Sequence, residues 1–336
     1  MDSLDVVRLT TQLVDVDTTT GREGALAGWL SDYLRRLGWS VSEQVVSDDR
    51  RNILATLDPP RVVFSTHYDC VPPFFPSRIE DERLYGRGAC DAKGILAAQV
   101  VAAERLRSAG ERRIGLLFLV GEERGSDGAI AANTLADGCA FLVNGEPTDN
   151  RLAAATRGAL RVRLEARGRA AHSSHPELGE SAVEKLIDVL VRLRNAEWPH
   201  DVMLGRTHYT VGLISGGVAP NVVPASAEAE IVFRTVGPND QVRDQLRTLA
   251  GSAAAVHDVL ELPLVRMVTV PGFETEVFPY STDIPCLTRW GQPLLYGPGS
   301  VLVAHTDEEH VPIPELHRAV DGYRRIAAAL LEGGTD

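Results

Sequence analysis

Short runs of apolar residues alternate with helix-like segments along the first 150 residues, and this alternation constrains the fold more than any other feature. The runs at 61–64, 113–120 and 141–143 are almost continuously apolar, which is typical of strands buried on both faces. A long segment with helical spacing of small and aliphatic residues, 92–107, separates the first two runs. Strands that alternate with helices in this way form parallel sheets covered by helices. The sequence therefore predicts an α/β domain with a mostly parallel sheet.

The remaining elements of this domain follow from the same reasoning. A segment rich in proline and charge, 72–83, is expected to be a surface loop. Helices are expected at 4–15, 21–37 and 126–135, and strands at 39–46 and 52–57.

The pattern changes after Arg157-Gly158, where apolar and charged residues begin to alternate as in a half-exposed strand. The order strand, helix, two strands, helix, strand predicts a ferredoxin-like α+β domain. After Pro271 the α/β pattern of the first domain resumes. The expected elements of the second domain are strands at 160–165, 207–214, 226–235 and 259–265 and helices at 180–194 and 239–255. The expected elements of the first domain after Pro271 are a helix at 283–290, a strand at 300–304 and a helix at 314–332.

The chain is therefore expected to have two domains, which suits its 336 residues. Residues 1–157 and 267–336 form the catalytic α/β domain in this interpretation. Residues 158–266 form an inserted lid, through which two copies of the chain pair.

Composition excludes several classes of partner. A net charge of −12 argues against nucleic acid and anionic membranes. No apolar run approaches the ~20 residues of a membrane span, and the N-terminus lacks the pattern of a secretory signal. The four cysteines form no C-x-x-C pair, which favours free thiols in a reducing cytoplasm.

A histidine, His67, follows the strand at 61–64, and an aspartate, Asp69, comes two residues later. Residues i and i+2 of an extended segment point to the same side. Asp69 can therefore hydrogen-bond the ring nitrogen of His67 that a bound metal leaves free, and so fix the tautomer of the histidine.

Further polar residues follow other predicted strands or precede a helix. Ligands of open α/β sheets bind outside the carboxyl ends of the strands, so these side chains are expected to meet. Several carboxylates gathered there would repel one another unless metal ions neutralised them. Mixed nitrogen and oxygen ligands suit zinc best, with cobalt or manganese as alternatives. The residues are His67, Asp91, Glu122, Glu123, Glu146 and His305.

Each residue taken alone has a structural interpretation. Asp91 suits a helix N-cap, Glu146 a solvated loop and His305 a structural histidine before a turn. The adjacent pair Glu122-Glu123 is harder to explain, since two buried neighbouring carboxylates need a reason. The thiols of Cys70 and Cys90 lie near these residues in sequence but are weaker candidates than the nitrogen and oxygen ligands.

Together these motifs resemble the zinc amidohydrolase and metallopeptidase family that contains acetylornithine deacetylase, succinyl-diaminopimelate desuccinylase, aminoacylase and the glutamate carboxypeptidases. They occur in the family's order over essentially the whole chain. The matching motifs are His67-Tyr68-Asp69, Gly86 to Gly94, Gly121-Glu122-Glu123, Gly145-Glu146-Pro147, Ala171-His172-Ser173 and Ala304-His305-Thr306.

The resemblance implies two zinc ions per chain, a catalytic role for Asp69 and a general-base role for Glu122. It alone separates Glu122 as base from Glu123 as ligand. It also implies a cis peptide bond after Asp91. The implied ligands are Asp91 as a bridge, with His67 and Glu146 on one ion and Glu123 and His305 on the other.

The resemblance assigns three residues of the inserted domain as well. His172 would reach the active site of a partner subunit and steady the oxyanion, so the chain is expected to be a homodimer. Asn221 would contact substrate, and Arg234 would clamp a substrate carboxylate. The string Ser281-Thr282-Asp283 suits a helix N-cap.

These expectations favour removal of an acyl group from the nitrogen of an amino acid, with acetylornithine deacetylase as the best single interpretation. N-acetyl-lysine deacetylase, desuccinylase and dipeptidase or carboxypeptidase activities are alternatives. A non-catalytic metal-binding protein is disfavoured, because Glu122 would have no structural use beside all five ligands.

Overall fold

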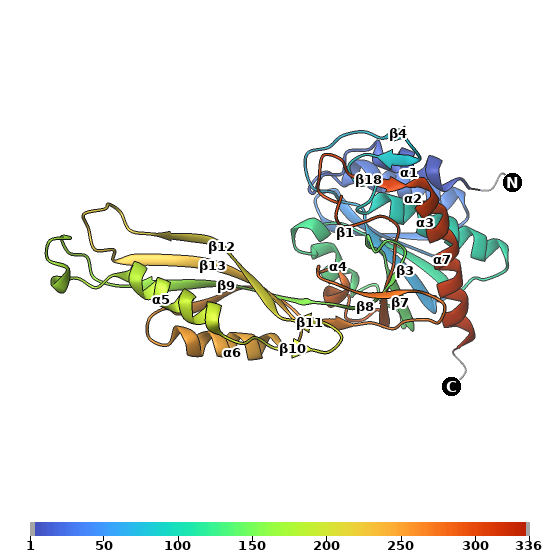
Figure 1. Cartoon of the computed structure of the whole chain (residues 1–336). Helices are drawn as coiled ribbons and strands as arrows, with labels where there is room; N and C mark the ends of the chain where they lie inside the picture. Colours follow the sequence, from blue (N-terminus) through green and yellow to red (C-terminus); the bar gives the residue numbers. More distant parts are fainter. Residues whose placement is uncertain (1–3, 334–336) are drawn as a thin grey trace. The chain divides into compact units, whose positions relative to one another are not determined.

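The computed structural model describes residues 4–333 and divides them into two compact units (Figure 1). The first unit comprises 4–154, 267–276 and 282–333. The second comprises 155–266 and 277–281. The range 158–266, which the sequence assigned to an inserted domain, lies inside the second unit.

A six-stranded sheet forms the centre of the first unit, in the order β1-β2-β6-β3-β7-β17. The pairs from β6 to β17 are parallel, and those of β1 with β2 and of β2 with β6 are antiparallel. The largely parallel α/β fold is thus confirmed. The strands are β1 (Ser40–Ser47), β2 (Arg50–Thr56), β3 (Val62–His67), β6 (Ile114–Leu119), β7 (Phe141–Asn144) and β17 (Gln292–Leu295).

Alternate residues of β3 pack into different cores, which explains why its sequence is continuously apolar. Val62 and Phe64 lie in the large cluster that contains the buried residues of α1, α2, α3 and α7. Val63 lies in a second cluster with residues of α4 and Trp290. The helices are α1 (Val6–Val14), α2 (Gly24–Arg36), α3 (Lys93–Ser108), α4 (Asp127–Ala132) and α7 (Ile313–Glu332).

Two expected elements of this unit are wrong. The apolar run at 300–304 is not a strand: Val303 N–H donates to the Ser300 carbonyl and Thr306 N–H to the Val303 carbonyl, at 3.2 and 3.4 Å. These successive turns leave Leu302 85% exposed. The strand that continues the sheet is β17 instead, and the helix expected at 283–290 is only a short 3-10 segment, η3 (Ile284–Cys286).

The expected loop at 72–83 contains regular structure too. Two short strands, β4 (Arg78–Glu80) and β5 (Arg83–Tyr85), pair with each other, and β5 also pairs with β18 (His310–Pro312). Proline and charge hid these strands because β4 is exposed throughout.

The second unit has a four-stranded antiparallel sheet in the order β12-β13-β9-β14. The buried residues of α5 and α6 pack with those of the sheet in one hydrophobic cluster. Along the chain the order is strand, helix, two strands, helix, strand, as predicted. The elements are β9 (Gly158–Arg167), α5 (Ala182–Asn195), β12 (His208–Gly216), β13 (Ser226–Thr235), α6 (Asn239–Ala250) and β14 (Ala255–Leu262).

The remaining elements are small. Strand β8 (Leu152–Thr156) lies between β15 (Val265–Arg266) and β16 (Thr275–Phe278) in a three-stranded sheet. A further pair is β10 (His200–Asp201) with β11 (Gly205–Arg206), and the other 3-10 segments are η1 (Glu122–Arg124) and η2 (Pro176–Leu178). Over residues 4–333, no helix has the length and apolar character needed to cross a membrane.

Candidate metal centre and active site

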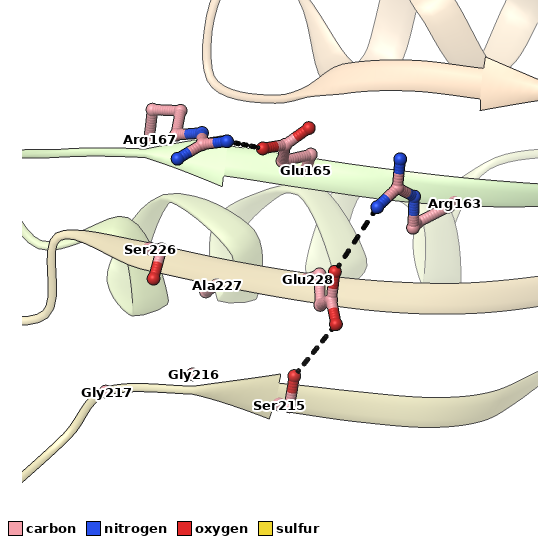
Figure 2. Close-up of a pocket in the computed structure, with 9 residues that line it drawn as sticks. All are labelled: Arg163, Glu165, Arg167, Ser215, Gly216, Gly217, Ser226, Ala227 and Glu228. Carbon is pink, nitrogen blue, oxygen red and sulfur yellow. Dashed lines mark hydrogen bonds and ion pairs between the residues drawn. The ribbon is translucent and has the colours of Figure 1, made fainter.

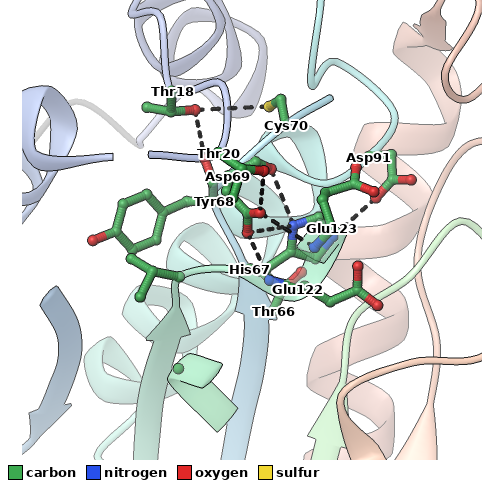
Figure 3. Close-up of polar contacts among 12 residues, drawn as sticks. Thr18, Thr20, Thr66, His67, Tyr68, Asp69, Cys70, Asp91, Glu122 and Glu123 are labelled. Atoms are coloured by element: carbon green, nitrogen blue, oxygen red, sulfur yellow. Dashed lines mark hydrogen bonds and ion pairs between the residues drawn. The ribbon is translucent and has the colours of Figure 1, made fainter. Parts of the chain in front are cut away.

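Three neighbouring parallel strands, β6, β3 and β7, end at one edge of the sheet, and each delivers part of a polar cluster. Figure 3 shows His67, Asp91, Glu122 and Glu123 of this cluster. His67 is the last residue of β3. Glu122 and Glu123 begin η1, shortly after β6, and Glu146 follows β7 by two residues. The sequence predicted this meeting at the carboxyl ends, and the structure confirms it.

Asp91 lies between two histidines, with one carboxylate oxygen toward each. Its Oδ1 is 2.9 Å from Nε2 of His67, and its Oδ2 is 3.3 Å from Nε2 of His305. The peptide bond between Asp91 and Ala92 is cis, as the sequence implied. Asp91 therefore has the geometry of a bridging ligand, since each oxygen faces a different nitrogen donor.

Two further carboxylates complete the arrangement. Glu146 Oε2 is 4.0 Å from Nε2 of His67, and Glu123 Oε1 is 3.0 Å from Nε2 of His305. Within each of the two resulting groups the candidate ligand atoms lie within 4.8 Å of one another. The groups are His67, Asp91 and Glu146, and Asp91, Glu123 and His305.

Asp69 holds both the first histidine and the turn that carries the two glutamates. Nδ1 of His67 lies 3.4 Å from Asp69 Oδ1 and 3.1 Å from the Asp69 carbonyl oxygen. The backbone N–H groups of Glu122 and Glu123 donate to Oδ1 and Oδ2, at 3.1 and 3.2 Å. Thr20 Oγ1 donates to Oδ2 at 2.9 Å. The Asp69 carboxylate lies beside Nδ1 of His67 as predicted, but the closer contact is with the backbone carbonyl oxygen. The hydrogen bonds to the glutamate turn are additional.

The pKa shifts and the burial of the cluster favour the binding of cations. Burial raises the pKa of Glu146 and of Glu122 well above that of an ordinary glutamate. Hydrogen bonds to Asp91 and Glu123 raise the pKa of His305 to about 10. Glu146 Oε1 is buried and has no hydrogen-bond partner among residues 4–333. An orphaned oxygen beside imidazole and carboxylate donors is what divalent metal ions would satisfy, so the residues fit a pair of them.

Comparisons with known proteins show the family of the chain. The family model for peptidase family M20/M25/M40 matches residues 63–329. A probable carboxypeptidase of Aspergillus clavatus is 35% identical over 367 aligned residues, which cover 95% of this chain and 81% of the relative. The chain belongs to the M20/M25/M40 peptidase family. It is therefore a hydrolase of a metallopeptidase family.

Solved structures of the M20 family share the fold. A tripeptidase of Staphylococcus aureus superposes with a TM-score of 0.82 at 19% identity, covering 98% of this chain and 99% of the other. The YXEP protein of Bacillus subtilis, described as a dinuclear metal binding peptidase from the M20 family, superposes with a TM-score of 0.74 at 16% identity, covering 97% of this chain and 98% of the other.

We expect zinc binding to the metal-free M20 chain to release protons at pH 7. His305, whose pKa is raised to about 10, holds a proton at pH 7 that the ligating form lacks, and burial shifts the pKa of Glu146 in the same direction. Because protons compete with the metal at groups with raised pKa, zinc affinity should fall as the pH falls. Calorimetry in buffers of different ionisation enthalpy measures the release. Binding without proton release, or tighter binding at pH 6 than at pH 8, would contradict this protonation pattern.

The predicted preference for nitrogen and oxygen ligands over thiols agrees with the structure. Neither ligand group found among residues 4–333 includes a cysteine. Cys90 Sγ donates to the Ser300 carbonyl at 3.3 Å, and Cys70 Sγ lies 3.7 Å from Thr18 Oγ1. Burial raises the pKa of Cys70 to about 12, which disfavours the thiolate that a metal would need.

The string Ser281-Thr282-Asp283 was expected to cap a helix, and within it Thr282 rather than Asp283 provides the capping hydrogen bond of η3. Ile284 N–H donates to Thr282 Oγ1 at 3.2 Å, and the Asp283 side chain makes no capping hydrogen bond. Asp283 is instead buried, and burial raises its pKa to about 7. A string of adjacent polar residues does not reveal which of them caps and which is buried, so the burial of this carboxyl group could not be predicted.

The structure brings two of the three candidate residues of the second unit together. Ser173, next to His172, donates its N–H to the Asn221 carbonyl at 3.0 Å, and His172 forms a β-bridge with Val222. Arg234 lies near the far end of β13, paired across the sheet with His208. At ~3.3 Å per residue, the eight steps from Ser226 to Arg234 place Arg234 roughly 26 Å along the strand.

A shallow pocket of about 430 Å³ lies on the exposed face of the second unit's sheet (Figure 2). Its charged residues form ion pairs with one another. Nη1 of Arg163 lies 3.7 Å from Oε2 of Glu228, and Arg167 pairs with Glu165. Such paired surface charges are typical of a solvated sheet face, and nothing in the pocket resembles a catalytic group. Its lining residues are Arg163, Glu165, Arg167, Ser215, Gly216, Gly217, Ser226, Ala227 and Glu228.

Proposed function

We propose that this chain is a di-metal hydrolase that cleaves a linear amide next to a carboxylate-bearing residue, in an N-acyl amino acid or a short peptide. One observation carries the proposal. Asp91 offers one oxygen to each ligand group, while Glu122, on the same turn as the ligand Glu123, belongs to neither. A site with bridge and ligands alone could be structural, but a half-buried carboxyl group beside it that belongs to neither ligand group points to proton transfer.

We assign His67 and Glu146 to one ion and Glu123 and His305 to the other, with Asp91 as the bridge. The donor set suits zinc, and cobalt or manganese are alternatives. Bound ions of this kind lower the pKa of a ligated water and polarise an amide carbonyl. The dinuclear metal binding of the Bacillus subtilis peptidase supports a two-ion site here.

Glu122 is the general base in this proposal. Burial raises its pKa, so the carboxylate binds a proton more readily than an exposed glutamate does. It can therefore accept a proton from the attacking water and return it to the leaving amine. Asp69 orients this step, because it fixes the backbone N–H of Glu122.

His172 is the oxyanion donor in this proposal, and its hydrogen bonds support the role. Ser174 N–H donates to Nδ1 of His172 at 3.2 Å, so Nδ1 carries no proton in the neutral ring. The proton then resides on Nε2, which is free to donate to a developing negative charge. His172 is exposed, as a group that serves a partner's site would be.

We propose that two copies pair through β12. This strand is at the edge of its sheet, and Leu213 and Ile214 are 65% and 62% exposed on it. An exposed apolar edge strand invites pairing with a second copy about a twofold axis. His172 and Asn221 would then serve one substrate from one copy, and Arg234 would meet it from the other.

Complementation tests the shared site. Mixing the inactive variants His172→Ala and Glu122→Gln should restore part of the activity, because some heterodimers carry one site with both groups intact. A His172→Ala/Glu122→Gln double variant mixed with wild type is the control, since neither hybrid site gains from it. A fully active monomer, or a mixture that exchanges subunits and stays inactive, would rule out donation between copies.

Two classes of substrate fit this proposal. The sequence motifs favour an N-acyl amino acid such as acetylornithine, and the name of the Aspergillus relative favours a peptide with a free carboxyl end. A hydrolysis screen of the zinc-loaded chain with acetylornithine, acetyl-lysine, succinyl-diaminopimelate and dipeptides decides. If the chain binds two ions and hydrolyses none of these classes of amide, a non-catalytic metal-binding role takes the place of this proposal.

We also propose a reducing, cytoplasmic setting. All four cysteines are free thiols, and Cys70, Cys90 and Cys139 are buried. Free thiols are typical of proteins in a reducing compartment.

A further inference from the structure

Glu309 is buried beneath the loop that carries Asp91, and it is not one of the candidate ligands. Its side chain has 0% exposure. Its Oε1 accepts hydrogen bonds from the backbone N–H groups of Gly88, Cys90 and Asp91, at 2.9, 3.2 and 3.1 Å. A single carboxylate oxygen thus collects three N–H groups of one short loop.

The other oxygen of Glu309 fixes a buried arginine of the same loop. Arg87 Nη1 donates to Oε2 at 2.5 Å, and the Arg87 side chain is 1% exposed. Arg87 Nε donates to the Pro73 carbonyl at 3.1 Å, and Gly86 N–H donates to the Glu309 carbonyl at 3.1 Å. The loop is therefore held at every second residue or closer from Gly86 to Asp91.

The loop 86–91 needs such a partner because it belongs to no helix or strand. Its residues are buried, so N–H groups without partners would carry a large desolvation cost. Gly88 adopts φ +88°, and a Cβ there would lie 2.7 Å from Cys70 Sγ. The loop therefore has a close-packed conformation in which successive N–H groups turn inward toward one anion.

Glu309 also belongs to the segment that supplies the second histidine. Only three residues lie between it and His305, which faces Asp91 Oδ2. The same short segment thus provides a ligand for one ion and the anchor of the bridging aspartate. Movement of Glu309 would change the position of Asp91 relative to both histidines.

We propose that Glu309 is a positioning residue that acts through Asp91 and sets the affinity of the site for its metal ions. This inference rests on the bridging role assigned to Asp91 in the proposed function. Removal of a group that orients a metal ligand typically lowers metal affinity about 10–100-fold. The competing explanation is that Glu309 contributes only to fold stability, as any buried ion pair with four hydrogen bonds could.

Zinc affinity of the Glu309→Gln variant separates these explanations. The amide oxygen can still accept from the loop, but the amide NH₂ would face the guanidinium of Arg87, donor against donor. Zinc affinity, measured by competition with a chromophoric chelator, should fall roughly 10–100-fold. The visible absorption of the cobalt-loaded variant should also change, because the ligand geometry changes.

Glu104→Gln is the matched control. Glu104 is 7% exposed, and it accepts hydrogen bonds from Trp39 Nε1 at 2.6 Å and from Arg107 Nη2 at 2.7 Å. It lies in the C-terminal part of α3, the helix that begins just after Asp91. This control should lower the melting temperature and leave zinc affinity and the cobalt spectrum unchanged.

Arg87→Lys provides a second test if Glu309→Gln does not fold. It keeps the positive charge but loses the planar fork, so zinc affinity should fall in the same direction. Zinc affinity within twofold of wild type in the folded variant would overturn the positioning role and leave the metal site intact. If the wild-type chain itself binds no metal, both this inference and the proposed function fail.

Discussion

The Asp91→Ala variant is expected to lose both metal ions and all measurable hydrolysis. Each Asp91 oxygen faces a different histidine, at 2.9 and 3.3 Å, so one substitution removes a ligand from both groups. Burial raises the pKa of Glu146 and of Glu123, so both carboxylates take up a neutralising proton more readily than an exposed glutamate once the cations are lost. Elemental analysis of purified protein should show a fall from two ions per chain to well below one.

Glu146→Ala is the control for that experiment, because Glu146 belongs to only one ligand group. It should weaken one ion and spare the other. Full occupancy of both sites in Asp91→Ala would show that Asp91 is not the bridge.

The Glu122→Gln variant is expected to keep both metal ions and its affinity for substrate while kcat falls roughly 10²–10⁴-fold. Glutamine has nearly the same shape as glutamate but cannot accept the proton of the attacking water. Because Glu122 is in neither ligand group, its substitution should not alter metal content. Steady-state kinetics on the best amide substrate, with metal analysis of the same sample, measure both quantities.

Glu123→Gln gives the contrasting result for the neighbouring residue. Its Oε1 lies 3.0 Å from Nε2 of His305, so its loss should reduce occupancy of one site before it affects proton transfer. Wild-type turnover by Glu122→Gln would remove Glu122 from the mechanism and leave the metal assignment standing.

The strands and the edge of the sheet could be predicted because their physical signals are local. Val62, Val63 and Phe64 are continuously apolar since alternate residues face two cores, and the polar residues begin where the strand ends. His67 and Glu146 could be placed at one edge for the same reason: parallel strands share their carboxyl ends. The order of the elements in the second unit was likewise readable from alternating patterns.

Other features depend on long-range packing and left no local signal. Val301 to Ala304 has the composition of a buried strand, but the backbone closes into turns there and Leu302 is exposed. Asp283 has the sequence context of a cap and is a buried acid. Glu309 lies among charged residues in a string that suggests a solvated loop, yet its hydrogen-bond partners are some 220 residues away in the chain.

Asp69 links the proposed metal ligand His67 to the proposed base Glu122, because it contacts both. The same carboxyl group lies against His67 and accepts the N–H groups of Glu122 and Glu123. An engineer who wished to adjust the ligand field without disturbing the base could not begin at this position. Substitutions at Asp69 and at Glu122 should combine non-additively in a double-mutant cycle, because the second change acts on a turn that the first has already released.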